Sequence, residues 1–533
     1  MAFFREEVRG RASVSRKSLA APLPRRIILQ GRIVTMDATS EIINDGVICI
    51  EEKNIAFVGP TGSMLPPDFL QVLPIQTHGT IYPGLVELHN HPAYNAVPLW
   101  TVPKLYPSRE MWRADPIYKR QVSNPATLLT HHPQEIYPKS VARFVECRAL
   151  LGGVTTTQGL TLSSLGSTVP YYQGLIRDVE FQYGANWPVA TDHINDFANF
   201  AEFDEQYGPL INQPLSRFVI HLCEGTDSAT RAIFDNLTDA SGKPLIGSNL
   251  IAIHATALGA AQFASLKNSG GIVWSPLSNF LLYGATTDVR SAENAGVQIA
   301  LGCDWSPSGT KNLLGELKVA KVVSDHLGDL FSSFDLAAMV TSIPARIMGW
   351  GAFLGSIEAG KQADLLVLDT VAGDPYSALI SATESDVVAV LVEGKTRVGR
   401  ASILDPNAGS VELIRIAGQE VVLDLIDSPN HPLANISLQG SISTLADALA
   451  HLPDLARTFN SGHSAIGGTG KRFYLHLGMD EVSAAAAVAG TTPIGPGDVD
   501  PMQLDAITSV DDPTFSERIR RNSNVPDWLR AEI

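Results

Sequence analysis

The chain has 533 residues and a formal net charge of -16 at pH 7, with 45% hydrophobic and 18% charged residues. This length and balance predict a globular protein of two or three domains. The acidic charge excludes nucleic acid and anionic membranes as the main partner, because such binders carry a basic face, so a small-molecule substrate is expected.

The cysteines and the N-terminus indicate the setting of the protein. Four cysteines without any CxxC pair exclude a disulfide framework and a zinc-thiolate site, and they favour a cytoplasmic location. Residues 1–26 are basic and lack an apolar run of signal-peptide length, so a flexible arm is expected. No stretch approaches the roughly 20 apolar residues that a membrane-spanning helix needs.

The rest of the chain divides into β-rich flanks, a repetitive centre and an accessory region. Short β-rich runs at 27–80 and 355–400 predict one small β-sandwich built from two distant segments. Residues 81–354 alternate apolar runs of strand length with helix-like stretches. This α/β alternation predicts a distorted (β/α)8 TIM barrel, with an open doubly wound sheet as the alternative. Residues 401–533, with an amphipathic helix expected at 442–459, are predicted to form a lid or an oligomer contact.

Two histidines follow the first apolar run of the centre, in the stretch PGLVELHNHPAYN. Side chains at i and i+2 of a strand share a face, so His89 and His91 point together and can hold one ligand. A lone buried histidine is more often a hydrogen-bonded core residue than a metal ligand. The pair alone therefore leaves both interpretations open.

Further polar residues end later apolar runs. His221 follows RFVI, His254 follows NLIAI, and Asp304 follows VQIALGC. The carboxyl ends of parallel barrel strands meet at one mouth, where active sites are built. Histidines and a carboxylate together make a zinc or ferrous iron site with room for water. Glu224, just past His221, is placed to carry protons, although any one of these residues alone could be a cap or a turn residue.

An ordered series of motifs carries a family resemblance. The series is PGLVELHNH, GVTT at 153–156, HLCE, IHATAL, SPLSN at 275–279, LGCD, and GSIEAGKQADLLVLD at 355–369. It resembles the metal-dependent amidohydrolase superfamily, and more narrowly its cytosine deaminase, guanine deaminase and triazine chlorohydrolase branch. The resemblance spans about residues 27–400 and implies the barrel and the flanking β-sandwich.

The resemblance also implies a metal site. Relatives with two metals often bridge them with a carboxylated lysine on the fourth strand, but residues 181–196 contain no lysine. We therefore expect one divalent metal ion per chain, zinc as the first choice and ferrous iron as the second. The implied metal ligands are His89, His91, His221 and Asp304.

The expected chemistry is hydrolysis of a C–N bond other than a peptide bond, such as deamination of an amino-heterocycle. Metal-activated water attacks an sp² carbon, Asp304 takes the proton of the water, and Glu224 protonates the ring nitrogen and then the leaving group. His254 stabilises the developing charge. Trp305 replaces a small residue common in the deaminases, so amide, lactam or C–halogen hydrolysis stays open. A structural metal site and a catalytically inactive scaffold are the non-enzymatic alternatives.

Substrate contacts are predicted on the loops at the barrel mouth. The aromatic insertion after the first strand fits either a flat substrate or a packed lid. Residues 308–312 and Glu316 are expected to line the pocket, although a helix cap explains them nearly as well. The family resemblance further implies a homo-oligomer, a dimer or larger. The predicted substrate contacts are Tyr94, Trp100, Ser278, Asn279, Trp305, Ser308 and Lys311.

Overall fold

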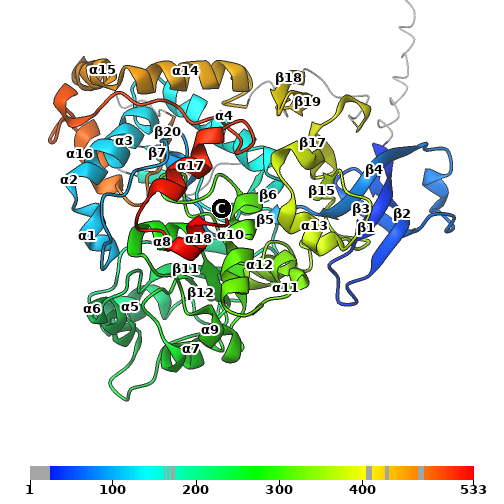
Figure 1. The fold of residues 1–533 in the computed structure, drawn as a ribbon, viewed down its shortest axis with the longest axis horizontal. Coiled ribbons are helices and arrows are strands. Elements are labelled where there is room, and N and C mark those ends of the chain that lie inside the picture. The colour runs from blue at the N-terminus through cyan, green and yellow to red at the C-terminus, as the bar shows by residue number, and fades with distance from the viewer. Residues whose placement is uncertain are drawn as a thin grey trace, which may run out of the picture.

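The computed structural model describes residues 24–160, 162–164, 167–169, 174–403, 411–426, 431–465 and 473–533. Of the arm predicted over residues 1–26, residues 1–23 lie outside these ranges. Figure 1 shows the N-terminal strands, in blue, side by side with strands of the later chain, in yellow, at one side of the molecule. The larger body beside them carries most of the helices.

A nine-stranded sheet joins the two flanks of the chain, in the order β18-β19-β17-β16-β15-β4-β1-β2-β3. Strand β4 pairs in parallel with β1 and antiparallel with β15, which places Pro83 opposite Leu365. The flanks therefore share one sheet, as predicted. The strands are β1 Arg26–Val34, β2 Ile42–Glu51, β3 Asn54–Pro60, β4 Pro74–Pro83, β15 Leu365–Leu368, β16 Val387–Val392, β17 Lys395–Gly399, β18 Val411–Ile416 and β19 Gln419–Asp424.

The sheet continues past residue 400 into the region that was expected to be accessory. Strands β18 and β19 form a hairpin around Ala417 and Gly418, whose φ angles are 49° and 79°. Two residues with positive φ make a turn that matches the twist of paired strands. This hairpin adds its second strand to β17 and extends the sheet.

Parallel strands in two sheets form the barrel: β5-β6-β9 and β10-β11-β12-β13-β14. Backbone hydrogen bonds close both seams, from Ala190 N to Val179 O over 2.9 Å and from His91 N to Asp304 O over 2.6 Å. The predicted distorted (β/α)8 barrel is confirmed, and the open sheet is excluded. The strands are β5 Leu85–Val86, β6 Val154–Thr157, β9 Arg177–Asp178, β10 Val189–His193, β11 Ser216–Leu222, β12 Leu250–His254, β13 Gly271–Trp274 and β14 Ile299–Leu301.

Local sequence explains where the barrel elements begin and end. Every residue of β12 is buried, as expected for a parallel strand covered on both faces. Helix α8 has Pro276 in its first turn and ends at Gly284, whose φ of 69° is left-handed. The described helices up to the end of the barrel are α1 Arg109–Arg113, α2 Pro116–Tyr118, α3 Asn124–Thr130, α4 Ile136–Leu151, α5 Phe200–Tyr207, α6 Ser228–Ala232, α7 Ala260–Leu266, α8 Pro276–Tyr283, α9 Val289–Asn294, α10 Leu313–His326, α11 Ser333–Ala338 and α12 Ser342–Met348.

Two helices replace the single helix predicted over 442–459, and that prediction is wrong. Helix α14 ends at Ala450 and α15 begins at Leu452. Pro453 has no amide hydrogen, and inside one continuous helix its ring would clash with the carbonyl group of Leu449. The remaining helices are α13 Pro375–Ser381, α14 Leu438–Ala450, α15 Leu452–Ala465, α16 Glu481–Val488, α17 Pro513–Arg521 and α18 Asp527–Arg530.

The C-terminal region reaches the barrel through a short strand. Strand β20 (Tyr474–Leu475) pairs with β7 (Leu162–Ser164), which also pairs with β8 (Ser167–Val169). Figure 1 shows α14 and α15 along one edge of the body, above α3 and α4. Among the described residues, no helix has the length and apolar character needed to span a membrane.

Candidate active site

Four histidines and one aspartate from the strand ends of the barrel meet in a buried cluster. His89 Nε2 lies 3.0 Å and His91 Nε2 3.6 Å from Asp304 Oδ1. His221 Nε2 lies 3.3 Å from His91 Nε2. Two overlapping sets have possible ligand atoms within 4.8 Å of one another: His89, His91 and Asp304, and His89, His221 and His254. The structure thus brings the predicted ligands together with His254.

Left-handed backbone at two of these residues turns their side chains into the cluster. His254 has a φ of 63° and Asp304 a φ of 66°. For residues other than glycine, such conformations cost about 1–3 kcal/mol and concentrate at functional sites. The turn after β12 is held by the Thr287 hydroxyl, which donates to the carbonyl oxygen of His254 over 2.6 Å.

The contacts of His89 test whether the cluster fits a cation. Gln158 hydrogen-bonds to the carboxylate of Asp192 through its amide NH2, so its Oε1 is left to accept from His89 Nδ1–H, 3.3 Å away. His89 Nε2 then presents a lone pair to Asp304 Oδ1 at 3.0 Å. Burial lowers the pKa of His89 to about 3, so no proton bridges these two atoms at neutral pH. A metal ion between them would remove the repulsion.

The other imidazoles also meet the requirement for ligation. Burial lowers the pKa of His91 to about 3 and the pKa of His221 well below its ordinary value. Metal ligation needs the neutral ring. A buried set of imidazole nitrogens and one carboxylate fits zinc or ferrous iron. The residues present therefore suit the implied divalent metal.

Glu224 lies beside the cluster as a buried carboxyl group. Its Oε2 lies 3.7 Å from His254 Nε2 and 3.8 Å from Arg109 Nη1, and the Tyr283 hydroxyl donates to Oε1 over 2.6 Å. Burial raises the pKa of Glu224 to about 8, against the opposing charge of Arg109. The group is therefore protonated at neutral pH, as a general acid must be.

Three hydrogen-bond relays hold Asp304, Glu224 and His254, and each begins at the indole of a buried tryptophan. An indole N–H can only donate, so the hydroxyl group that accepts from it keeps its own hydrogen for the next residue of the relay. Each relay therefore decides which atom of its last residue faces the cluster. The first relay runs from Trp305 to Ser308 (2.6 Å), from Ser308 to Ser278 (2.8 Å) and from Ser278 to Asp304 Oδ2 (2.6 Å). The second runs from Trp112 to Tyr283 (2.8 Å) and from Tyr283 to Glu224 Oε1 (2.6 Å). The third runs from Trp274 to Thr286 (2.7 Å), from Thr286 to Asn279 (3.2 Å) and from Asn279 to His254 Nδ1 (3.1 Å).

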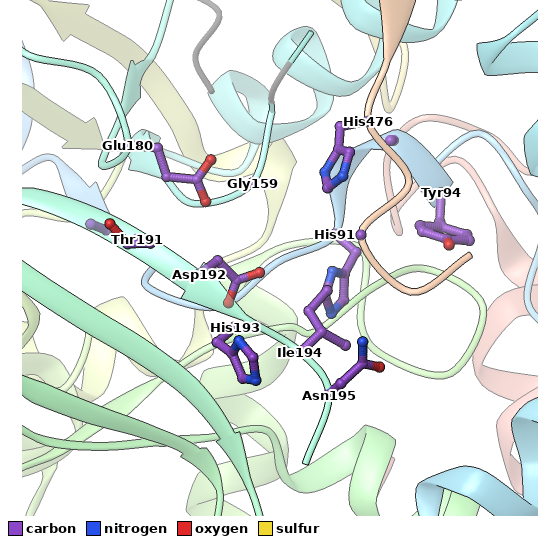
Figure 2. Close-up of a pocket in the computed structure, with 13 residues that line it drawn as sticks. His91, Tyr94, Gly159, Glu180, Thr191, Asp192, His193, Ile194, Asn195 and His476 are labelled. Carbon is purple, nitrogen blue, oxygen red and sulfur yellow. The ribbon is translucent and has the colours of Figure 1, made fainter. Parts of the chain in front are cut away.

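A cavity of about 300 Å³ opens beside His91. Figure 2 shows Asp192 and His193 of β10 on one side of this space and His476, from the C-terminal region, near His91. Burial raises the pKa of Asp192 to about 7. Carboxyl groups, imidazoles and Tyr94 thus surround a space next to the metal ligands, suited to a small polar molecule.

The segment that carries His476 is fixed to the aromatic insertion by Asp480. The hydroxyl groups of Tyr94 and Tyr118 both donate to Asp480 Oδ2, over 2.7 and 2.6 Å. Arg113 also donates to the carbonyl oxygen of Met479. The wall of the cavity formed by the C-terminal region is therefore bonded to the barrel and not loosely placed.

Most predicted substrate contacts take other roles. Tyr94 lines the cavity, whereas Ser278, Asn279 and Ser308 belong to the relays. Trp305 starts a relay and packs edge-on to the His91 ring, with centroids 6.0 Å apart. Its position explains the departure from a small residue, because the indole supplies the donor that the Asp304 relay needs.

Trp100 and Lys311 do not line the cavity. Trp100 is buried, with its ring 6.2 Å from that of Tyr106. The Lys311 ammonium group lies 2.7 Å from the carboxylate of Asp512. In the same stretch, Asn312 caps α10 by accepting from two backbone amides, so the helix-cap interpretation fits these residues better than a pocket lining.

Several residues of the site were not found from the sequence, among them Gln158, Tyr283 and His476. Gln158 directly follows strand β6, of sequence VTTT, so the strand-end criterion applied to His221 would have found it. Tyr283, at the end of α8, and His476 carry no motif.

The amidohydrolase family model matches residues 219–397. The chain is 23% identical over 411 residues to a 5-methylthioadenosine/S-adenosylhomocysteine deaminase of Symbiobacterium thermophilum, which covers 70% of this chain and 93% of the relative. The match therefore extends over nearly the whole relative and leaves part of this chain unmatched.

Solved structures share the fold at low sequence identity. E. coli guanine deaminase superposes with a TM-score of 0.54 at 17% identity, covering 69% of this chain and 99% of that chain. A variant of atrazine chlorohydrolase from Arthrobacter aurescens TC1, complexed with zinc and atraton, gives a TM-score of 0.52 at 18% identity, covering 70% and 95%.

Proposed function

We propose that this chain is an amidohydrolase that hydrolyses C–N bonds, and that it deaminates an amino-heterocycle with the help of one divalent metal ion. The observation that carries the proposal is the buried Glu224 carboxyl group beside the histidine and aspartate cluster, with its Oε2 3.7 Å from His254 Nε2. A structural metal site is normally closed by four ligands and has no acid beside it. The similarity to deaminases supports the substrate class.

His89, His91, His221 and Asp304 would hold the metal. A divalent cation bound there would supply Lewis-acid activation of a water molecule at neutral pH. Zinc is the first choice because the ligand set mixes imidazole nitrogen and carboxylate oxygen.

The side chains of this protein then move the protons. Asp304 accepts a proton from the attacking water, while the hydrogen bond from Ser278 to Oδ2 orients its carboxylate. Glu224 donates its proton from Oε2 to the ring nitrogen, because Oε1 is already bonded to Tyr283. It then carries the hydrogen of the added hydroxyl group to the leaving amino group. Water thus adds its oxygen to the ring carbon, the C–N bond breaks, and the amino group leaves as ammonia.

The test is metal content by mass spectrometry together with ammonia release from aminated purine, pyrimidine and triazine rings. We expect about one zinc or iron per chain in the wild type and in Glu224→Gln, and loss of the metal in Asp304→Ala. Ammonia release should fall by about 10²–10⁴-fold in Glu224→Gln and stay normal in Glu205→Gln, a control on exposed α5.

Two other results would overturn the proposal. Bound metal with release of a carboxylic acid or a halide, and no ammonia, would assign amide or C–halogen hydrolysis. A wild type that binds no metal even after reconstitution would leave a scaffold protein.

A further inference from the structure

His89 and His254 each have an amide side chain next to Nδ1, but the amide is a hydrogen-bond acceptor at His89 and a donor at His254. At His89, Gln158 presents its carbonyl oxygen at 3.3 Å. At His254, Asn279 presents its NH2 group at 3.1 Å. An imidazole facing an acceptor carries its hydrogen at that nitrogen, whereas one facing a donor carries it at the other nitrogen.

The orientation of Asn279 follows from its own partners. Trp274 Nε1–H can only donate, and it donates to Thr286 Oγ1 over 2.7 Å. In the structure the Thr286 hydroxyl group donates to Asn279 Oδ1, 3.2 Å away. With its oxygen accepting from Thr286, the Asn279 amide can present only NH2 to His254.

The surroundings of the opposite ring nitrogen agree with this orientation. His254 Nε2 lies 3.7 Å from Glu224 Oε2 and 4.0 Å from Asp304 Oδ2. The carboxylate oxygen of Asp304 can accept a hydrogen bond from Nε2–H. No partner bonds this nitrogen among the described residues.

We propose that Asn279, oriented by Thr286 and Trp274, fixes His254 as a hydrogen-bond donor at Nε2 and so keeps it from binding the metal. A ring nitrogen that bears hydrogen has no lone pair for a cation. His254 is therefore excluded as a ligand, whereas His89 and His221, the other members of its set, remain free to bind the metal. Asn279 is a positioning residue, and only the catalytic consequence of its role rests on the proposed function.

The first test needs no substrate. In metal-free full-length protein labelled with ¹⁵N at the histidine rings, long-range ¹H–¹⁵N spectra distinguish protonated from unprotonated ring nitrogens. The His254 signals are assigned by their loss in His254→Gln. We expect hydrogen at Nε2 in the wild type and in Thr286→Ser, which keeps the hydroxyl group. In Asn279→Asp the carboxylate accepts from Nδ1, so the hydrogen should move there.

Zinc binding gives a second readout, measured by competition with a chelator. His254→Gln should keep about one zinc per chain with affinity within threefold of the wild type, whereas His221→Gln should lose it. Asn279→Asp should slow ammonia release by at least about 10²-fold without loss of zinc.

Defined results would overturn the inference. Hydrogen at Nδ1 of His254 in the wild type would do so, as would loss of zinc in His254→Gln equal to that in His221→Gln. If Asn279→Asp does not fold, the same test compares the His254 tautomer in Thr286→Val with that in Thr286→Ser. An unchanged tautomer in Thr286→Val would count against the relay. Lack of ammonia release with the expected spectra would reject only the proposed function.

Discussion

His91 and Asp304 form a backbone hydrogen bond, and their side chains also lie close to each other. His91 N donates to Asp304 O over 2.6 Å, and His91 Nε2 lies 3.6 Å from Asp304 Oδ1. The backbone bond closes one seam of the barrel at the place where the possible ligands meet. The spacing of the first and last barrel strands therefore sets the geometry of the site, and side chains behind it refine that geometry.

Gln158→Leu should weaken zinc binding by about 10–100-fold, because outer partners of ligating histidines contribute this much to affinity. The change removes the acceptor of His89 Nδ1–H, so the ring no longer has a fixed tautomer. Chelator competition measures the affinity. Gln298→Leu, at the exposed residue just before β14, is the control and should bind zinc as the wild type does. Equal affinities in the two variants would contradict the assigned role.

Tyr283→Phe should move the alkaline fall of activity to higher pH. Burial raises the pKa of Glu224 to about 8, and the Tyr283 hydroxyl opposes this by stabilising the carboxylate. The protonated form is the proton donor, so activity falls as pH rises through this pKa. Without the hydroxyl the pKa should rise further. The pH profile of kcat/KM, compared with that of Tyr376→Phe, measures the shift, and coincident profiles would refute it.

Tyr118→Phe should loosen the wall of the cavity that carries His476. It removes one of two hydroxyl donors to Asp480 Oδ2, and a buried hydrogen bond to a carboxylate stabilises by about 1–3 kcal/mol. Hydrogen exchange of residues 474–481 should quicken. Tyr82→Phe removes the buried hydrogen bond from Tyr82, on β4, to the carbonyl oxygen of Pro375 at the start of α13, and it should leave exchange in this segment unchanged. Equal protection in both variants would show that Asp480 does not anchor the wall.

Glu481→Gln should lower stability near pH 5 by about 1–2 kcal/mol. Burial raises the pKa of Glu481, but the hydrogen bond and charge of His131 and the charge of His476 outweigh burial and hold this pKa at about 2. The imidazole charges act only where the rings are protonated, and burial lowers the pKa of His476, so the contribution belongs to acidic pH. A lowered carboxyl pKa stabilises the fold above the unfolded value, near 4.5, and this contribution is lost as pH falls toward about 2. Urea unfolding of both proteins should therefore differ more at about pH 5 than at about pH 2.5. A difference that grew as the pH fell between these two values would be the wrong sign.

The sequence alone was enough to predict the site residues that stand at the ends of barrel strands. His221, His254 and Asp304 each end an apolar run, and parallel strands bring their ends to one mouth. The same reasoning gave the barrel, because fully buried runs alternate with helices.

The remaining contacts depend on tertiary placement that no local pattern encodes. Lys311 pairs with Asp512, 201 residues later, so its ammonium group is drawn away from the barrel mouth. His476 reaches the cavity only because β20 pairs with β7 and Asp480 binds two tyrosines. The relay partner Tyr283 is the last residue of the short helix α8, and Thr286 follows this helix. The SPLSN motif covers only the beginning of the helix.

The pairing of β4 with β15 has a consequence for biosynthesis. Pro83 pairs with Leu365 only after the intervening barrel has been translated, so a nascent chain holds β1 to β4 with the edge of β4 unpaired while it leaves the ribosome. Such long-range pairing is slow, and an open edge invites pairing with another chain. Slow translation at low temperature, or a chaperone that covers this edge, should therefore raise the yield of folded protein.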